Sequence, residues 1–94
     1  MRNDETRDTE LQFVCDPENH HYMVVHLGWI EDGMRRVYGC IIHVDIKNDK
    51  IWIQRDGTEI GVANELLEAG VPKQDIVLGF HAPYKRKYTD FAVE

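Results

Sequence analysis

Apolar and polar side chains alternate along residues 38–46, and this alternation is the clearest pattern in the chain. Every second position there is apolar or aromatic, as in a β-strand with one buried face, namely Tyr38, Cys40, Ile42, Val44 and Ile46. The next residues include Asn48 and Asp49, which tolerate positive φ and favour a tight hairpin. We therefore expect a following strand that pairs Ile46 with Ile51, Val44 with Ile53, Asp45 with Trp52 and His43 with Gln54.

Two further turn signals lie earlier in the chain. Asp32-Gly33 is a strong hairpin signal, and residues 17–19 suit a three-residue loop. These turns would pair Val25 with Cys40, Met23 with Ile42, Leu27 with Tyr38, Phe13 with Met23, and Leu11 with Val25. All of these pairs place apolar residues on one common face, so the pattern predicts a four-stranded antiparallel meander.

The segment after the hairpin changes to a helical period. Its apolar residues recur at three- and four-residue spacing, at Ile60, Ala63, Leu66 and Leu67. Asp56 and Glu59 resemble a capping box, Thr58 is a second N-cap candidate, and Gly70 followed by Pro72 indicates the end of the helix. We expect one main amphipathic helix packed on one face of the meander, followed by a short extended segment at residues 76–80.

These elements predict a small α+β domain. We expect residues 10–94 to form a single domain and the polar residues 1–9 to be a disordered or linker segment. A chain of 94 residues buries only about 60–65% of its unfolded surface, and one short helix covers little of a four-stranded face. Self-association or a partner would supply the missing burial, so we expect a homo-oligomer or a bound partner.

The charge of the chain argues against autonomous nucleic-acid binding. The formal net charge is −6, whereas nucleic-acid affinity rests mainly on Lys and Arg residues that neutralise phosphates. A local exception is the weak nucleic-acid candidate Lys85, Arg86 and Lys87, which lies between Tyr84 and Tyr88. A short solvated tail explains this run more simply.

Cysteine usage and hydropathy point to the cytoplasm. Cys15 and Cys40 fall on the predicted apolar face without metal-ligand spacing, so we expect reduced core residues. The sequence has no apolar run of membrane-spanning length, and its N-terminal segment lacks the architecture of a secretory signal. We therefore expect a cytoplasmic protein that does not contact a membrane.

Searches for catalytic or metal chemistry give no complete set. His26 lies too far along its strand from His43 to share an ion with it, and adjacent His20 and His21 point to opposite faces of a regular strand. A nuclease-like Mg²⁺ site at Asp45 lacks its second carboxylate, because Gln54 stands in that position. The chain has no serine. We therefore predict no catalytic residue, no metal site and no cofactor.

The mixed face of the predicted sheet suits recognition better than catalysis. A tryptophan beside polar groups on the second face of a sheet is typical of an interface anchor. The candidate partner-binding residues are Tyr22, His26, His43, Asp45, Trp52, Gln54 and Arg55. Capping and a local ion pair are the simpler explanation for Arg55, because it stands where the strand meets the helix.

Six segments together resemble the XisI family, the fdxN element excision controlling factor proteins. They are residues 24–29 (VVHLGW), 35–45 (RRVYGCIIHVD), 50–59 (KIWIQRDGTE), 61–67 (GVANELL), 70–80 (GVPKQDIVLGF) and 86–93 (RKYTDFAV). The resemblance implies a cyanobacterial α+β accessory factor, often encoded beside a XisH-type protein that resembles restriction-like nucleases, with the recombinase being a separate protein. Family members usually begin with a long helix before the first strand, whereas this sequence begins with a short polar stretch.

Three functional hypotheses follow. The leading one is a non-catalytic regulatory subunit that binds a XisH-type partner, and a related form is an antitoxin-like inhibitor of that partner. The rival is a DNA-binding accessory to a site-specific recombinase, which would use the basic run. An enzyme is the third, and it would require bound metal that is lost when His43 or Asp45 is replaced.

Overall fold

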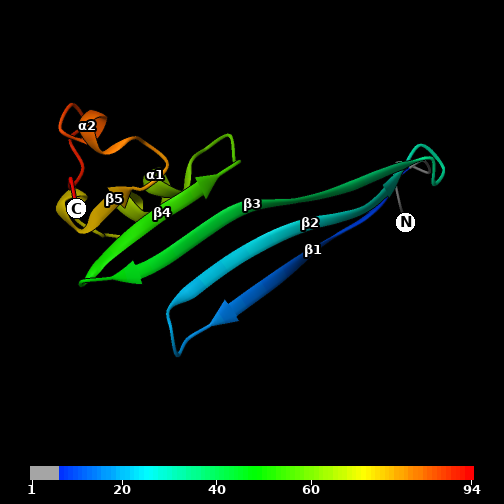
Figure 1. The fold of residues 1–94 in the computed structure, drawn as a ribbon, viewed down its shortest axis with the longest axis horizontal. Helices are drawn as coiled ribbons and strands as arrows, with labels where there is room; N and C mark the ends of the chain where they lie inside the picture. Colours follow the sequence, from blue (N-terminus) through cyan, green and yellow to red (C-terminus); the bar gives the residue numbers. More distant parts are fainter. Residues whose placement is uncertain (1–6) are drawn as a thin grey trace.

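The structure, a computed structural model, describes residues 7–94 and consists of one mixed sheet with a few short helices (Figure 1). The sheet order follows the chain from β1 to β5. The elements are β1 (Arg7–Asp16), β2 (His21–Ile30), β3 (Arg35–Lys47), β4 (Lys50–Asp56), α1 (Val62–Glu68), the 3₁₀ turn η1 (Lys73–Asp75), β5 (Ile76–Leu78) and α2 (Pro83–Arg86). None of the helices in this part of the chain is long and apolar enough to cross a membrane.

The hairpin between β3 and β4 forms as predicted near its turn. Asn48 and Asp49 have φ of 54° and 62°, the positive values that a two-residue hairpin turn requires. The turn therefore sets the pairs Ile46 with Ile51, Asp45 with Trp52 and Val44 with Ile53, as expected. The earlier pairs Val25 with Cys40 and Leu27 with Tyr38 are also confirmed.

Two β-bulges shift the remaining pairs by one residue. Between β2 and β3, the extra residue is Ile41, so Ile42 pairs with Val24 and not with Met23. Between β3 and β4, the extra residue is Gln54, so His43 pairs with Arg55 and not with Gln54. The predicted pairs Met23 with Ile42 and His43 with Gln54 are therefore wrong. A regular alternation of apolar and polar residues does not reveal where an extra residue is inserted.

The first hairpin is also shifted by one residue. Its turn spans residues 17–20 and includes His20, which adopts a positive φ of 59°, whereas a three-residue loop was predicted. Phe13 therefore pairs with Val24, and Leu11 with His26. The strand also begins earlier than expected, because residues 7–9 belong to β1; residues 1–6 of the predicted linker lie outside the described residues.

The fifth strand changes the sheet from an antiparallel meander to a mixed sheet. β5 pairs with β4 in parallel, Ile53 lying opposite Leu78, after a crossover through α1. The last residues add one bridge beside β5, between Val77 and Ala92. The four-stranded antiparallel prediction is thus correct for β1 to β4 and incomplete for the sheet.

The helix α1 is shorter than predicted and covers a different part of the sheet. It begins after Gly61, because the Asp56 carboxylate accepts the amide hydrogen of Val62 at 2.7 Å and holds the preceding loop. It ends at Gly70 in a Schellman motif, in which Gly70 and Val71 donate to the carbonyls of Leu67 and Leu66 at 3.0 Å. The predicted contact residue Ile60 lies before the helix and is 68% exposed.

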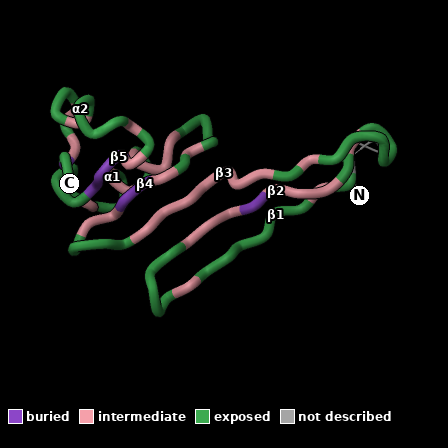
Figure 2. Tube along the Cα trace, in the orientation of Figure 1, coloured by how far each residue is buried: buried purple, intermediate pink, exposed green. Residues whose placement is uncertain are grey.

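The buried core lies on both sides of β4 and β5, where Figure 2 shows most of the buried chain. On one side, Ile53, Ile76 and Leu78 pack against α1, Val71 and Phe91. On the other side, Trp52 and Val77 pack against Ala92. We call β4, β5, α1 and residues 69–94 the covered region.

By contrast, most of β1, β2 and residues 35–41 of β3 have no covering layer; we call these segments the arm. In Figure 1 the arm extends away from the covered region. Pairing and alternation place apolar side chains on both of its faces, with Leu11, Phe13 and Val24 on one and Val14, Met23 and Leu27 on the other. Cys15 is exposed, so its predicted core position is wrong, whereas Cys40 is half-buried.

Candidate functional site

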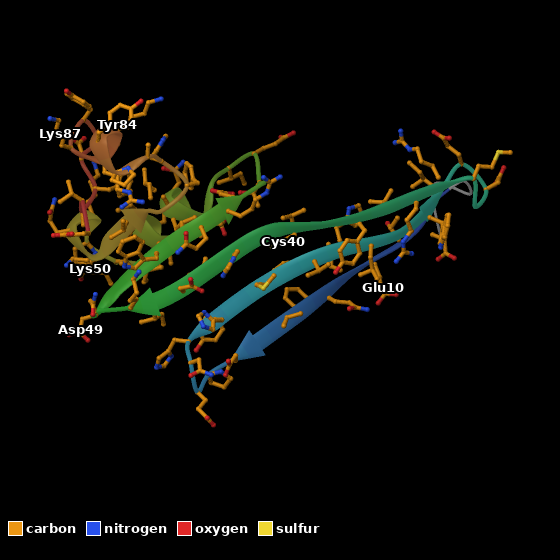
Figure 3. All side chains as sticks on the ribbon, in the orientation of Figure 1. Glu10, Cys40, Asp49, Lys50, Tyr84 and Lys87 are labelled. Atoms are coloured by element: carbon orange, nitrogen blue, oxygen red, sulfur yellow. The ribbon has the colours of Figure 1, made fainter. Side chains whose placement is uncertain are left out.

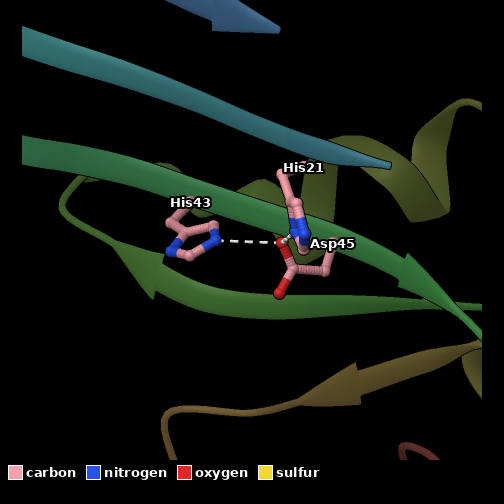
Figure 4. Close-up of side chains that lie close together, drawn as sticks. All are labelled: His21, His43 and Asp45. Carbon is pink, nitrogen blue, oxygen red and sulfur yellow. Dashed lines mark hydrogen bonds and ion pairs between the residues drawn. The ribbon is translucent and has the colours of Figure 1, made fainter. Parts of the chain in front are cut away.

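A cluster of polar side chains joins β2, β3 and β4 at the boundary between the arm and the covered region. It consists of His21, His43, Asp45 and Gln54, and we call it the histidine–aspartate cluster. His21 begins β2 directly opposite Asp45, and His43 lies two residues before Asp45 on the same face of β3 (Figure 4). Adjacent strands thus hold the three ionisable side chains together.

The two imidazoles converge on one carboxylate oxygen. His21 Nδ1 lies 2.7 Å and His43 Nε2 lies 2.9 Å from Asp45 Oδ1. The second oxygen, Oδ2, accepts a hydrogen bond of 3.3 Å from Gln54 Nε2. The exposed fractions of the side chains are 16% for Asp45, 32% for His43 and 53% for His21, so the carboxylate is the innermost group.

Hydrogen bonding keeps this carboxylate ionised. Burial raises the pKa of Asp45, but the hydrogen bonds from His21, His43 and Gln54 outweigh it, so the pKa lies below the ordinary value of 3.8. An ionised carboxylate is only an acceptor, so each histidine donates a ring N–H to Oδ1. The cluster therefore consists of one carboxylate anion and two imidazole donors. A cation bound at Oδ1 would replace the two hydrogen bonds from the imidazoles.

The chemistry available to the cluster is binding and proton sharing. Its three ligand atoms lie within 4.8 Å of one another, which is close enough for one metal ion. The sequence has no serine, and Cys40 Sγ donates to the carbonyl oxygen of Ile42 at 3.1 Å. The four side chains of the cluster include no hydroxyl or thiol that could act as a nucleophile.

The structure brings together three of the predicted partner-binding residues, His43, Asp45 and Gln54, and separates others. Tyr22 was expected on the same mixed face as His43 but pairs with Val44, which places it on the other face of the sheet. His26 shares that other face by alternation along β2, so its grouping with His43 is wrong as well. Arg55 donates to the carbonyl oxygen of Cys40 at 3.2 Å.

Sequence reasoning missed His21, the third ionisable residue of the cluster. A regular hairpin counted from Asp32-Gly33 would place His21 opposite Val44. The extra residue Ile41 moves Asp45 into register with His21. No turn residue or spacing in the sequence marks that bulge, so the pairing could be recognised only in the folded sheet.

Trp52 lies in the core and not on a free surface. Its side chain packs with Val77 and Ala92, and the residue is 8% exposed. Two cations lie over the ring, Lys47 Nζ at 4.0 Å and Arg86 Cζ at 5.2 Å from its centroid. The indole Nε1 is buried without a hydrogen-bond partner. Trp52 therefore joins the C-terminal segment to the sheet within this chain.

The basic run divides between internal and exposed side chains. Arg86 donates to the carbonyl oxygens of His81 and Gly79, at 3.1 Å and 3.4 Å, besides its contact with Trp52. Lys85 and Lys87 are exposed and lie near the rings of their neighbours Tyr84 and Tyr88. Figure 3 shows Tyr84 and Lys87 around α2, far from Glu10 on the arm.

An open groove lies between β3 and the start of α1. Its volume is about 350 Å³, and its lining combines apolar side chains with two carboxylates. The lining residues are Ile42, Thr58, Glu59, Ile60, Val62 and Glu65. The groove continues the face of the arm that carries Phe13 and Val24, because Val24 pairs with both Phe13 and Ile42.

Comparison with known proteins places this chain in one family. Residues 1–93 match the family described as XisI protein. A crystal structure of a XisI-like protein from Anabaena variabilis has 49% sequence identity and a TM-score of 0.86, covering 94% of this chain and 79% of that chain.

A second crystal structure, described as the fdxN element excision controlling factor XisI from Anabaena variabilis, has 38% identity and a TM-score of 0.78. That similarity covers 98% of this chain and 81% of the other. A search of curated proteins finds no match. The family match spans almost the whole chain, and both structures share its fold at high identity. The chain belongs to the XisI family.

Proposed function

We propose that this protein is a non-catalytic accessory factor that acts by binding a XisH-type, nuclease-like partner through its arm. One observation carries the proposal: both faces of the arm expose apolar side chains that nothing else in residues 7–94 covers. Exposed apolar surface of this extent is a feature of interaction sites. A relative named as an excision controlling factor supports a regulatory role in DNA excision.

The dimensions of the chain support the same proposal. Its radius of gyration is 16.0 Å, whereas a compact domain of this length has about 12 Å. Its accessible surface is 6954 Å², whereas a monomer of this mass has about 5,600 Å². The excess, about 1,350 Å², is larger than the roughly 800 Å² that each partner buries in a standard interface.

Charge favours a basic partner. The net charge is −6, and Glu59 and Glu65 line the groove that continues the apolar face of the arm. A nuclease-like protein carries a basic cleft for nucleic acid, so an acidic and apolar surface would complement it. An antitoxin-like inhibitor would use the same surface and differ only in its effect on the partner.

The test is co-purification with an authentic XisH-type protein. Phe13→Glu should abolish association, because the Phe13 ring on the arm is 74% exposed. Tyr88→Glu is the matched control: Tyr88 is an aromatic residue of the covered region that is 78% exposed, and its replacement should leave association intact. No association of the unaltered proteins at micromolar concentration would refute the proposal.

Two further measurements separate related roles. Sedimentation of the protein alone shows whether a second copy occupies the arm, in which case Phe13→Glu would convert a homo-oligomer to a monomer. Expression of the partner with and without this chain shows whether binding inhibits the partner or enables it. Growth arrest that this chain relieves would identify an antitoxin-like inhibitor.

A DNA-binding accessory is the second candidate, and the exposed Lys85 and Lys87 favour it. Their double replacement by Ala should weaken any salt-dependent DNA binding, whereas the absence of binding at low salt would exclude this role. Arg86 already bonds to two carbonyl oxygens of its own chain, which leaves only two free cations in the run. The partner-binding role therefore has the stronger support.

A further inference from the structure

We propose that His21, His43 and Asp45 form a binding site for one divalent transition-metal ion, with Zn²⁺ as the best-fitting ion. Two imidazole nitrogens and one carboxylate oxygen are a ligand set that suits Zn²⁺, and Mg²⁺ and Ca²⁺ favour sites made of oxygen alone. Three ligands from the protein leave a fourth position for water or for a donor from a bound partner. This proposal is independent of the partner-binding role.

The three ligand atoms lie within 4.8 Å of one another, and side-chain rotation must adjust their spacing to admit the ion. The two nitrogens lie 2.7 Å and 2.9 Å from Asp45 Oδ1. Bonds of about 2.0–2.1 Å in a tetrahedral site place ligand atoms roughly 3.3 Å apart. The His21 side chain, which is half exposed, can supply this movement by rotating away from the carboxylate, so the backbone of β2 and β3 need not move.

The surroundings of Asp45 orient its carboxylate for this role. Gln54 donates to Oδ2 and leaves Oδ1 for the two nitrogens. Such hydrogen bonds from a second residue orient metal-binding carboxylates and raise affinity. The carboxylate is also the innermost and ionised group of the cluster, so its charge is in place before a cation arrives.

The sheet register holds the ligands in advance. His21 and Asp45 are directly paired across β2 and β3, and His43 lies on the same face as Asp45. The bulge at Ile41 produces this pairing, and the Ile41 carbonyl oxygen also accepts the amide hydrogen of Gly57 at 2.6 Å, in the loop between β4 and α1. An ion at this point would link the start of β2 to β3, at the boundary where the covering layer ends.

The test is titration of the full chain with Zn²⁺ by calorimetry, and with Co²⁺ by its visible d–d absorption. We expect one ion per chain and a Co²⁺ spectrum typical of four or five ligands that include nitrogen. Each ring must present a nitrogen lone pair to the ion, so a neutral imidazole moves its hydrogen from the nitrogen beside Oδ1 to its other ring nitrogen.

Variants assign the site. Gln54→Leu removes a hydrogen bond to the Asp45 carboxylate and should weaken Zn²⁺ binding by about 10- to 100-fold. His21→Ala and Asp45→Asn each remove a ligand of the ion and should weaken binding by more than this. His26→Ala is a matched control on the other face of β2 and should bind as the unaltered chain does. Far-ultraviolet circular dichroism checks that each variant remains folded.

His20→Ala distinguishes this site from adventitious binding by the adjacent histidines at the turn. Equal weakening by His20→Ala and His21→Ala, with no effect of Asp45→Asn, would overturn the proposal. So would the absence of Zn²⁺ binding to the folded chain at 100-fold excess of the ion. Retained affinity in His20→Ala, together with its loss in Asp45→Asn, would support it.

Discussion

The covered region and the arm are built from the same alternating strands, yet they bury their residues very differently. In the covered region, Ile53, Ile76 and Val77 are fully buried between α1 and the C-terminal segment. In the arm, Val25 is the only buried residue among those described, and Phe13 is largely exposed. The comparison shows that strand pairing organises apolar residues, whereas their burial depends on a second layer.

The test with the largest expected effect is a substitution that creates a cavity in the covered region. Ile53→Ala should lower the free energy of unfolding by about 2–5 kcal/mol, because the side chain is fully enclosed by β5 and α1. Urea denaturation followed by circular dichroism measures this change. Leu11→Ala in the arm is the control and should cost less, because half of its surface already faces solvent. Equal losses would show that the arm is as well packed as the covered region.

A second test disrupts the arm through its backbone. Gly28 has φ of 145°, and a Cβ there would meet the carbonyl oxygen of Asp8 and lie 2.6 Å from Thr9 Cα. Gly28→Ala should therefore cost about 2 kcal/mol and loosen β1, which hydrogen exchange of the β1 amides would detect.

Gly39→Ala is the matched control for this change, because no atom lies within 4 Å of an added Cβ at Gly39. It should leave the exchange of β1 unchanged. Slow exchange throughout β1 in Gly28→Ala would show that the close approach of the two strands is dispensable.

A third test concerns the acid stability of the covered region. Burial raises the pKa of Asp56, but hydrogen bonds from Thr58 and Val62 outweigh it, and the pKa lies below 3.8. Its stabilisation is therefore fully present above the ordinary pKa and is lost as pH falls through the lower, folded-state value. Asp56→Asn should cost about 1 kcal/mol at neutral pH and make unfolding less dependent on pH below 4.

Asp16 provides the corresponding control in the arm. Its pKa is also lowered, chiefly by the side-chain hydrogen bond from Asn19, but Asp16 lies at the first turn, outside the covered region. Asp16→Asn should change the acid limb of the stability profile less than Asp56→Asn does. A larger effect of Asp16→Asn would place the acid-sensitive contact in the arm.

The smallest expected effect separates folding from association. Phe13→Ala should change the stability of the isolated chain by less than about 0.5 kcal/mol, since its ring is mostly in solvent. The same change should weaken association with the proposed partner. Thermal unfolding of the free protein and of the complex measures both. A large loss of stability in the free chain would mean that the protein is already self-associated through the arm.

The parts of the fold that could be predicted are those that local turn chemistry controls. Asn48-Asp49 set the register of β3 and β4 near their turn, and Gly70 ended α1 where the sequence indicated. The bulges at Ile41 and Gln54 could not be predicted, because an inserted residue leaves the local alternation plausible on both sides. The errors in pairing all follow from these insertions or from the longer turn at His20.

The candidate site shows the same limit. Asp45 and His43 could be predicted to share a face from their spacing alone. His21 joins them only because the bulge displaces β3 by one residue against β2. Trp52 was expected on a free face, because no local pattern in the sequence indicates that residues 76–94 fold back over it. Contacts between residues far apart in the sequence, and not local secondary-structure propensity, determine the position of His21 and the burial of Trp52.

The parallel pairing of β4 with β5 has a consequence for how the chain folds. Each antiparallel hairpin joins neighbouring residues and can form early, whereas Ile53 meets Leu78 only after the whole crossover through α1 has closed. The most buried part of the molecule is therefore expected to assemble last, while the arm is already paired but still lacks a covering layer. During synthesis, a chain held at that stage would present apolar strands to any protein nearby.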